Sequence, residues 1–445
     1  MKIELSGHYG YRRIVKTMAP MVLMMLVTSV YSIVDGFFVS NFAGSNAFAG
    51  MNLIWPAFAL VGALGIMIGS GGSALVAKTL GEGEKERAIR IFSSMIRLTA
   101  VLGIITGAIL FAFMPQVVRW LGSDAVMEPF AISYGRILTA FLPCYMLQMA
   151  FQPFYMVAEL PQIGTRMSII CGVANIVLDA VFVAGLGWGL NGAAVATAIS
   201  FLVGAVVPLW FFASRRNRTH LRLVRGGTTA RDIIKACING MSEFVGNIAL
   251  NVVGICYNWQ LMKYIGAFGV DAYGIVMYLA FIFAAVFIGY NMGISQVISF
   301  NYGAGNTAEL RSLLHKSLVL IGIGGTFMTV LAETSAPLLA RIFVGYDREL
   351  CSLTVHATRI YMLSFIICGF NMFTSAWFTA LNNGIVSAVA AFVRTLVFEL
   401  SAVFILPSVF GIDGIWYSIN AAEIMSLVLS FSLIFGFRRI AFGYS

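Results

Sequence analysis

Charged residues are scarce in this sequence. Only 11% of its 445 residues are Asp, Glu, Lys or Arg, whereas 60% are hydrophobic and the mean hydropathy is +0.90. A soluble domain could not keep so much apolar surface from aggregating, so the composition predicts a protein that crosses a membrane repeatedly. Long polar segments are also absent, which excludes a folded domain outside the membrane.

Patterns that would hold a metal, a disulfide framework or a redox centre are also absent. The six Cys are scattered without a CxxC pair, and the four His show no metal-ligand spacing. We therefore predict no cofactor and no enzyme. The opening segment MKIELSGHYGYRR contains an acid and lacks a small-residue cleavage site. We interpret it as leading into a first membrane helix and not as a signal peptide.

What the chain does contain is long apolar runs. A helix needs about 20 apolar residues to cross the hydrocarbon layer. The sequence therefore predicts an all-α polytopic membrane protein with twelve transmembrane helices. The runs fall near residues 15–39, 49–77, 92–114, 131–156, 165–187, 190–213, 233–262, 270–300, 314–337, 355–381, 385–408 and 413–436.

Basic residues gather on one side of this predicted topology. If the first helix runs outward, only six of the 28 Lys and Arg fall at outer ends and Arg394 lies within a span, while the others fall at inner ends and loops. This positive-inside bias predicts that both termini lie in the cytoplasm. The net charge of +9 thus reflects orientation in the lipid bilayer and indicates no nucleic-acid partner.

An internal repeat divides the chain. The pattern GxS…GxG at residues 71–83 recurs 222 residues later, at residues 293–305. Because each half holds an even number of spans, both halves enter the membrane in the same orientation. We predict two pseudo-symmetric six-helix bundles, an N-lobe over residues 1–213 and a C-lobe over residues 233–445, joined by a basic cytoplasmic linker over residues 214–232. Such duplication is typical of transporters that work by alternating access.

Ionisable side chains inside the predicted spans are few. Each costs at least about 2.5 kcal/mol on insertion scales, so each needs a reason. Asp35 and Asp179 both fall in the outer half of the membrane in the first bundle. Asn175 precedes Asp179 by one turn on the same helix face, and Tyr134 and Thr197 fall at a similar depth. These side chains could converge on one site if their helix faces meet.

The second bundle provides a comparison for the two acids. At the 222-residue displacement Asp179 corresponds to Ser401, and a local alignment of SNAFAG with VDAYGI places Asp35 opposite Gln260. The repeated scaffold therefore packs without these acids, which favours a functional role for them over a purely structural one.

The chemistry of the first-bundle residues suits a small cation. A carboxyl group in low-dielectric surroundings favours its neutral form, so it can take up and release a proton. Carboxylate, amide and hydroxyl oxygens also suit a hard ion such as Na⁺. We predict a cation-coupling site for H⁺ or Na⁺ at Asp35, Asn175, Asp179, Thr197 and Tyr134, with the first four as Na⁺ ligands. The residue types do not decide between the two ions.

The second bundle has its own charged side chains within spans. Arg394 and Glu423 fall at similar depth on neighbouring spans, which favours a structural ion pair, and Glu399 could join their network. Glu243 lies on the inner part of the seventh span. It either belongs to such a network or contacts a cationic substrate.

Several of these segments resemble one known family. SIVDGFFVS around Asp35, the repeated GxS…GxG, and NIVLDAVF followed by GLNGAAVAT are similar to the MATE (multidrug and toxic compound extrusion) transporters over essentially the full length. The resemblance implies export of amphipathic, often cationic, drug-like compounds in exchange for H⁺ or Na⁺. By motif it assigns Asp35, Asn175, Asp179 and Thr197 to the N-lobe cation site, with Tyr134 beside them.

The same resemblance implies a bend of the first helix at Pro20. One position departs from the family pattern. A NorM-type branch pairs a Glu on the seventh helix, matched here by Glu243, with an Asp on the tenth, where this sequence has Asn371. The chain therefore looks closer to the DinF- or MepA-like bacterial branches, whose coupling is placed in the N-lobe. That resemblance implies a multi-pass protein of the bacterial cytoplasmic (inner) membrane.

The favoured function is secondary active multidrug efflux by antiport, in a chain that we expect to be monomeric. A lipid-linked precursor flippase of the same superfamily is the alternative, but its pyrophosphate would call for cationic residues where this chain has mainly acids. An intramembrane prenyltransferase needs paired Asp-rich motifs for Mg²⁺-diphosphate, which a single NxxxD does not supply. A channel is disfavoured because the duplicated bundles differ in Asp35 and Asp179.

Overall fold

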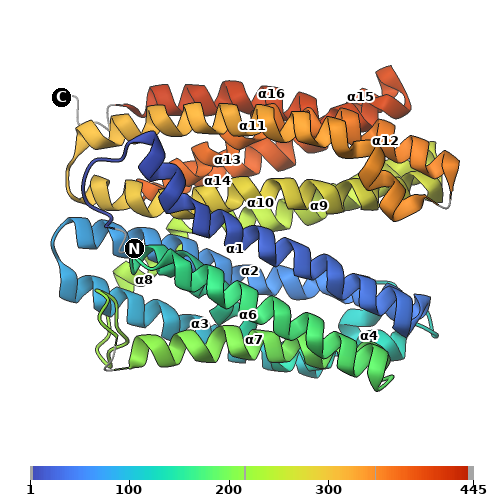
Figure 1. The fold of residues 1–445 in the computed structure, drawn as a ribbon, viewed down its shortest axis with the longest axis horizontal. Coiled ribbons are helices and arrows are strands. Elements are labelled where there is room, and N and C mark those ends of the chain that lie inside the picture. The colour runs from blue at the N-terminus through green and yellow to red at the C-terminus, as the bar shows by residue number, and fades with distance from the viewer. Residues whose placement is uncertain (1–3, 215–216, 346, 439–445) are drawn as a thin grey trace.

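The protein is a stack of two helical lobes. The computed structural model describes residues 4–214, 217–345 and 347–438, and these residues form helices and connecting loops without a strand. In Figure 1 the N-lobe (blue to green) lies below the C-lobe (yellow to red), and the first helix runs obliquely between them. The predicted all-α class is therefore confirmed.

The N-lobe is built from helices that satisfy their own backbone hydrogen bonds, as lipid requires. Short π-helical segments, labelled η1 and η2, extend two of them. The elements are α1 (Tyr11–Phe38), η1 (Val39–Ala43), α2 (Ser45–Gly81), α3 (Lys85–Trp120), α4 (Glu128–Ala140), α5 (Leu142–Val157), α6 (Pro161–Asp179), η2 (Ala180–Gly185) and α7 (Gly189–Ala213).

The C-lobe repeats this order of helices, again with a π-helical segment, η3, inside one span. The elements are α9 (Met241–Tyr264), α10 (Ala267–Gly303), α11 (Thr307–Val344), α12 (Arg348–Met362), α13 (Phe365–Ala380), α14 (Gly384–Phe392), η3 (Val393–Glu399), α15 (Leu400–Phe410) and α16 (Ile412–Gly436).

The helices account for twelve spans. Within the described residues nine helices are long and apolar enough to cross a membrane, and the bent pairs α4–α5 and α12–α13 raise that number to eleven. Helix α9, with 24 residues, occupies the place of the seventh predicted run and completes the twelve. The arrangement agrees with the prediction of six spans in each lobe.

Equivalent spans are broken at equivalent positions. The α4–α5 pair bends by 56° and the α12–α13 pair by 49°. The breaks fall at Phe141 and at Leu363, which are 222 residues apart. In the first lobe Pro143 lies at the start of α5, where its missing N–H costs no helical hydrogen bond. The repeat read from the sequence thus extends to the bend of a membrane span.

The junction between the lobes differs from the prediction. The seventh span was expected to start near residue 233, but Gly240 separates a short helix, α8 (Ala230–Asn239), from α9. Helix α8 is amphipathic, with Asp232, Ala236 and Asn239 buried on one face. It packs alongside α2 and against the start of α3 as a separate helix, and α9 begins only after Gly240. Residues 215 and 216 of the predicted linker lie outside the described residues.

The two lobes meet through few helices. Helix α1 packs against α10 of the C-lobe and against α6 of its own lobe, while α2 packs against α10, α9 and α8. Because α1 touches both lobes along its length, a side chain on α1 can respond to the arrangement of either lobe.

Candidate functional site

Two carboxyl groups approach each other inside the N-lobe. Asp35 lies in the last turn of α1, and Asp179 is the last residue of α6, directly before η2. Their side chains are close enough for a hydrogen bond. Asp179 is fully buried, and neither of its carboxylate oxygens has a hydrogen-bond partner in the described chain. Two ionised carboxylates offer no donor to one another, so only a proton on one of them would join the pair.

Neutral polar groups from two further helices complete this cluster. The Nδ2 of Asn175 donates to Oγ1 of Thr197 on α7 at 3.4 Å, and Thr197 also lies beside Asp35. The hydroxyl of Tyr134, on α4, lies near both carboxyl groups. Asn175 and Tyr134 are each 1% exposed, yet Oδ1 of Asn175 and the Tyr134 hydroxyl lack partners. The structure therefore brings together all the residues predicted for the first-bundle site.

The donor set of this cluster fits a proton or a hard cation. A buried oxygen without a hydrogen-bond donor lowers the folding stability by about 1–3 kcal/mol. A group of such oxygens therefore indicates a binding role and not a packing role. Carboxylate, amide and hydroxyl oxygens are the ligands that hard ions prefer. Within the described part of the chain no three His, Cys, Asp or Glu side chains are grouped as metal ligands. The cluster offers two carboxylates surrounded by neutral oxygens.

The charged side chains of the C-lobe form a separate, satisfied network. Arg394, in η3, donates to Oε1 of Glu423 through Nη2 at 2.5 Å and through Nε at 3.0 Å. The Nδ2 of Asn371 donates to Oε2 of Glu423 at 2.6 Å, and its Oδ1 accepts from Ser430 at 2.8 Å. The expected Arg394–Glu423 pair is thus present, and its charges compensate each other.

Glu399 and Glu243 differ in their relation to this network. Glu399 lies near Glu423 and beside the hydroxyl of Tyr257. Glu243, in the first turn of α9, has no ion pair among the described residues and no hydrogen bond to Arg394 or Asn371. The structure therefore does not place Glu243 in the Arg394–Glu423 network. Its contact with a cationic substrate stays a prediction.

Pro20 lies in the same pair of helices as the two acids. Its carbonyl accepts a hydrogen bond from the hydroxyl of Thr165 on α6 at 2.6 Å. Helix α1 continues through Pro20, and the bend expected there stays a prediction.

Several polar residues near the site were not singled out from the sequence. Tyr278, on α10 of the C-lobe, lies close enough to Asp35 to interact with its charge. Gln148 and Gln152, one turn apart on α5, are buried within the N-lobe, and Oε1 of Gln148 has no partner. The sequence feature that points to Gln148 and Gln152 is the presence of two amide side chains in the otherwise apolar run LQMAFQPF.

One end of the molecule is closed by direct contacts between the lobes. We call it the basic end; it holds the α2–α3 and α10–α11 turns and the start of α1 (Figure 1). There the segment of residues 4–9, the N-terminal strap, bridges both lobes. The backbone N–H of Leu5 donates to Glu159 of the N-lobe at 3.0 Å, and that of Tyr9 donates to Glu309 of the C-lobe at 2.8 Å.

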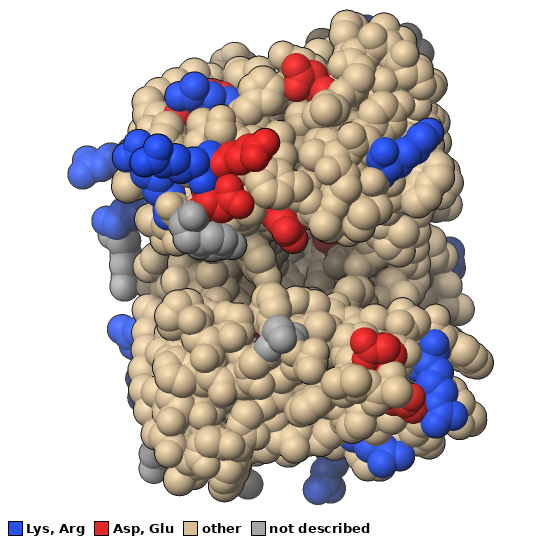
Figure 2. Space-filling view, turned by 90° about the vertical axis from the view of Figure 1, so that its right-hand side faces the viewer, with Lys and Arg blue, Asp and Glu red and all other residues tan. Residues whose placement is uncertain are grey.

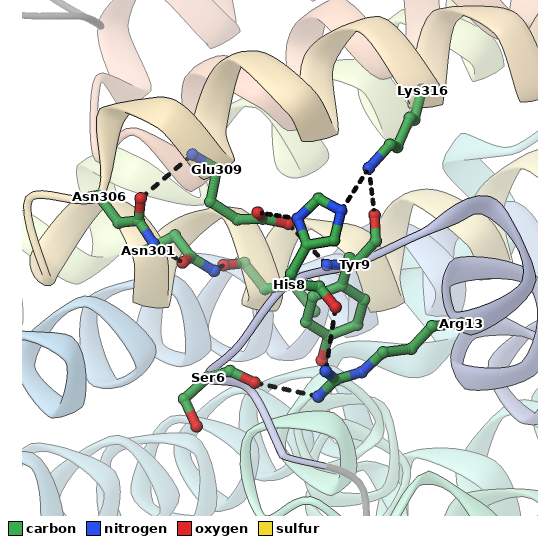
Figure 3. Close-up of polar contacts among 9 residues, drawn as sticks. Ser6, His8, Tyr9, Arg13, Asn301, Asn306, Glu309 and Lys316 are labelled. Carbon is green, nitrogen blue, oxygen red and sulfur yellow. Dashed lines mark hydrogen bonds and ion pairs between the residues drawn. The ribbon is translucent and has the colours of Figure 1, made fainter.

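Side chains reinforce the attachment of the strap to α11. Figure 3 shows His8 directed at Glu309, with Nδ1 and Oε2 separated by 2.8 Å, and Lys316 donating to the carbonyl of Tyr9 at 2.6 Å. Arg13 folds back on the strap and donates to the carbonyl oxygens of Ser6 and His8. The strap is thus a structured link across the basic end.

The opposite end is hollowed between the lobes. Figure 2 views that end and shows a groove that separates the upper lobe from the lower one. The lobes therefore touch at the basic end and are separated by a groove at the opposite end.

Known proteins share both the sequence pattern and this fold. The sequence model of the MatE family matches residues 20–181 and 244–405. The multidrug export protein MepA of Staphylococcus haemolyticus is 23% identical over 444 residues, which cover 99% of this chain and 97% of that protein.

Two solved structures superpose on almost the whole chain. One is an outward-facing conformation of a multidrug resistance MATE family transporter of the MOP superfamily (22% identity, TM-score 0.91, 98% of this chain and 97% of that one). The other is a MOP superfamily transporter from Pyrococcus furiosus whose binding pocket has reverse polarity (22% identity, TM-score 0.92, 99% and 98%). At this level of identity the likeness shows the fold.

Proposed function

The chain belongs to the MatE family of multi-pass membrane transporters, and from that premise we propose that it exports amphipathic, often cationic, organic compounds in antiport with H⁺ or Na⁺. The observation that carries the proposal is the cluster of unpartnered buried oxygens around Asp35 and Asp179. A cluster of this kind gains stability when a cation or a proton enters it, and a gradient can supply either.

In this proposal the N-lobe cluster is the coupling site. A proton shared by Asp35 and Asp179, or a Na⁺ held by Asp35, Asn175, Asp179 and Thr197, satisfies the buried oxygens. Tyr134 contributes its hydroxyl to the same cluster. The transported compound enters the groove between the lobes, and its affinity falls when the coupling ion binds, because antiport requires reciprocal destabilisation of the two ligands.

The coupling site communicates with the groove through α1. Asp35 lies on α1, which packs against α10, and Tyr278 of α10 lies near the Asp35 carboxyl group. Filling the cluster therefore changes the charge that faces the C-lobe. That change in charge at the lobe interface biases the exchange between outward-open and inward-open arrangements.

We further propose that the basic end faces the cytoplasm and that the groove in Figure 2 opens to the outside. The excess of Lys and Arg at the basic end supports this orientation. The described arrangement would then be the one that releases the compound and loads the coupling ion.

A lipid-linked precursor flippase is the alternative within the same superfamily. Its diphosphate would need free cations along the groove. Arg394, which lies within a span, is held by Glu423, and this pairing favours a cationic or neutral cargo over an anionic one.

The test uses purified protein in liposomes that contain a fluorescent organic cation. Export is driven by a pH gradient or by a Na⁺ gradient, applied separately. We expect one gradient to drive export and Asp179→Asn to lower that rate at least about tenfold, which corresponds to about 1.4 kcal/mol. The matched control is Asp413→Asn, which removes an acid paired with His356 at the start of α16. If Asp179→Asn exports as fast as wild type under both gradients, the coupling site is wrong.

A further inference from the structure

Helix α8 lies at the junction of the lobes and is held there by specific contacts. The Asp232 carboxylate accepts from Arg87 of α3 at 2.9 Å and from the hydroxyl of Thr228 at 2.7 Å. A Cβ atom on Gly71 of α2 would lie 2.0 Å from the carbonyl oxygen of Ala236, so α2 and α8 touch through their backbones. Any ligand of α8 therefore acts on an element that connects the N-lobe to the C-lobe.

A pocket of 490 Å³ opens beside α8 at the basic end. One wall is α8 itself, and the other is the turn that leads into α14. The close approach of the walls is set by Gly384, where a Cβ would lie 2.3 Å from Cα of Asn239. The lining includes the cations Arg231 and Lys235, the amides Asn239 and Asn382, and the isoleucines Ile234 and Ile385.

The pocket carries two cationic side chains, and neither forms an ion pair within the described chain. Arg231 and Lys235 are one turn apart on α8 and thus project to the same side. Asp232 is occupied by Arg87, and Lys78 pairs with Glu82 at 3.6 Å, whereas no ion pair within the described chain includes Arg231 or Lys235. Partial burial and then the charge of Lys78 lower the pKa of Lys235. An anion in the pocket would relieve this repulsion.

Polar acceptors lie deeper in the same pocket. Asn239 is 1% exposed, and its Oδ1 has no hydrogen-bond partner; its Nδ2 donates to the carbonyl of Thr379. Oδ1 of Asn382 is also buried without a partner. Two buried amide oxygens of this kind call for a ligand that carries hydroxyl or ammonium donors.

The rim of the pocket is apolar and exposed. Ile234 and Ile238 follow one another along α8 at 58% and 37% exposure, and Ile385 on the facing wall is 67% exposed. An amphipathic helix with cations beside exposed aliphatic side chains is typical of the membrane–water interface. The rim is therefore suited to hydrocarbon chains and the interior to a charged, hydrogen-bonding group.

We propose that this pocket binds one anionic phospholipid, with its phosphate between Arg231 and Lys235, its headgroup hydroxyls at Asn239 and Asn382, and its acyl chains against the exposed isoleucines. The basic end, in the proposed orientation, meets the inner leaflet, where anionic lipids are enriched and basic pockets recognise them. Binding adds contacts to α8 while α8 packs on α2, so the lipid stabilises the arrangement in which the basic end is closed.

The test measures the melting temperature of the full chain in neutral detergent with added phosphatidylglycerol, with phosphatidylcholine, or with soluble glycerol 3-phosphate. A ligand that binds only the folded state raises the melting temperature in proportion to its occupancy. We expect phosphatidylglycerol to raise it by several degrees, and the other two additives to leave it unchanged. Native mass spectrometry should show one retained phosphatidylglycerol per chain.

Matched variants localise the effect. Arg231→Gln/Lys235→Gln should lose the thermal shift and at least about 1.4 kcal/mol of lipid affinity, a tenfold loss. The control Arg12→Gln/Lys16→Gln removes two exposed cations with the same one-turn spacing at the same end, and it should keep the shift. The single exchange Lys235→Gln should lose part of the thermal shift, and it replaces the double variant if that protein cannot be purified.

The proposal is overturned by any of three results. Equal melting-temperature shifts in the two double variants would mean that the lipid does not act through Arg231 and Lys235. A shift with glycerol 3-phosphate would identify a soluble anion as the ligand. The absence of a shift with phosphatidylglycerol would mean that the pocket takes no anionic lipid.

Discussion

Gly81 and Gly303 hold equivalent places in the two lobes and bring α2 and α10 into backbone contact. A Cβ atom on Gly81 would lie 2.0 Å from the carbonyl oxygen of Phe300, and a Cβ on Gly303 would lie 2.0 Å from that of Lys78. The repeated glycines seen in the sequence therefore mark the place where the lobes touch at the basic end. No larger side chain fits there without separating the helices.

The first prediction concerns this crossing. Gly81→Ala inserts a methyl group against backbone and should destabilise the closed basic end by about 1–3 kcal/mol, as overpacking does. The variant should melt at a lower temperature and export more slowly. Gly254→Ala is the control, because a Cβ at Gly254 meets nothing within 4 Å. Equal melting temperatures for the two variants would contradict the backbone contact.

The second prediction separates stability from function at Tyr134. Its buried hydroxyl has no partner, so Tyr134→Phe removes an unsatisfied group and should raise the stability by about 1 kcal/mol. The same change removes an oxygen from the coupling cluster and should slow gradient-driven export. Thermal melting and liposome export measure the two effects. A variant that is both less stable and fully active would refute the assignment.

The third prediction treats the Arg394–Glu423 pair as structural. Glu423→Gln leaves the guanidinium of Arg394 without its compensating charge and should destabilise the C-lobe by about 3 kcal/mol. The double change Arg394→Met/Glu423→Leu removes both charges and should recover most of this loss, with export retained. Urea or thermal unfolding measures the energies. If the double variant folds but no longer exports, the pair has a transport role instead.

The fourth prediction tests the strap. Glu309→Ala removes the acceptor of the Tyr9 N–H and the partner of His8. Hydrogen exchange in residues 4–9 should then accelerate at least about tenfold, since each factor of ten reflects about 1.4 kcal/mol of lost protection. Glu349→Ala, at an exposed acid on α12, is the control and should leave the exchange unchanged. Identical exchange in both variants would mean that the strap is held by other contacts.

The fifth prediction is a pH dependence at Asp232, outside the spans. Burial raises the pKa of this carboxyl group, but the hydrogen bonds from Arg87, Thr228 and Thr229 outweigh it and hold the pKa below its usual range. The ionised carboxylate therefore stabilises the fold at pH values above the unfolded pKa of about 4. This contribution disappears as the pH falls through the lower pKa of the folded state.

The measurement is the melting temperature of wild type and Asp232→Asn against pH. The difference should be constant near neutral pH and shrink below about pH 4, the usual range of an Asp carboxyl group. A difference that grows on acidification would contradict the sign of the shift.

The membrane fold was readable from local chemistry. Apolar runs of sufficient length predicted every span, and the shared displacement of residues 71–83 and 293–305 predicted two lobes. The boundary at α8 was missed because a short amphipathic helix and the start of a span are both helical and partly apolar. Only the tertiary structure distinguishes these two possibilities, through the contact of α8 with α2 and the break between α8 and α9 at Gly240.

The candidate site was predictable in its residues but not in its assembly. Asp35 and Asp179 stand out because charge is costly in lipid, and that cost is a property of the sequence alone. Tyr278 and Gln148 did not stand out, since neutral polar groups are tolerated in many packed helices.

What the sequence by itself determined is the number of spans, their repeat and the residues too polar to be accidental. The tertiary structure decided which of these residues meet. It joins Asp35 to Asp179, isolates Arg394 with Glu423 and leaves Glu243 outside that network. The reason is that helix rotation and crossing depend on backbone contacts between distant segments, such as the contact of Gly81 on α2 with Phe300 on α10. No local pattern specifies which helix faces will be opposed.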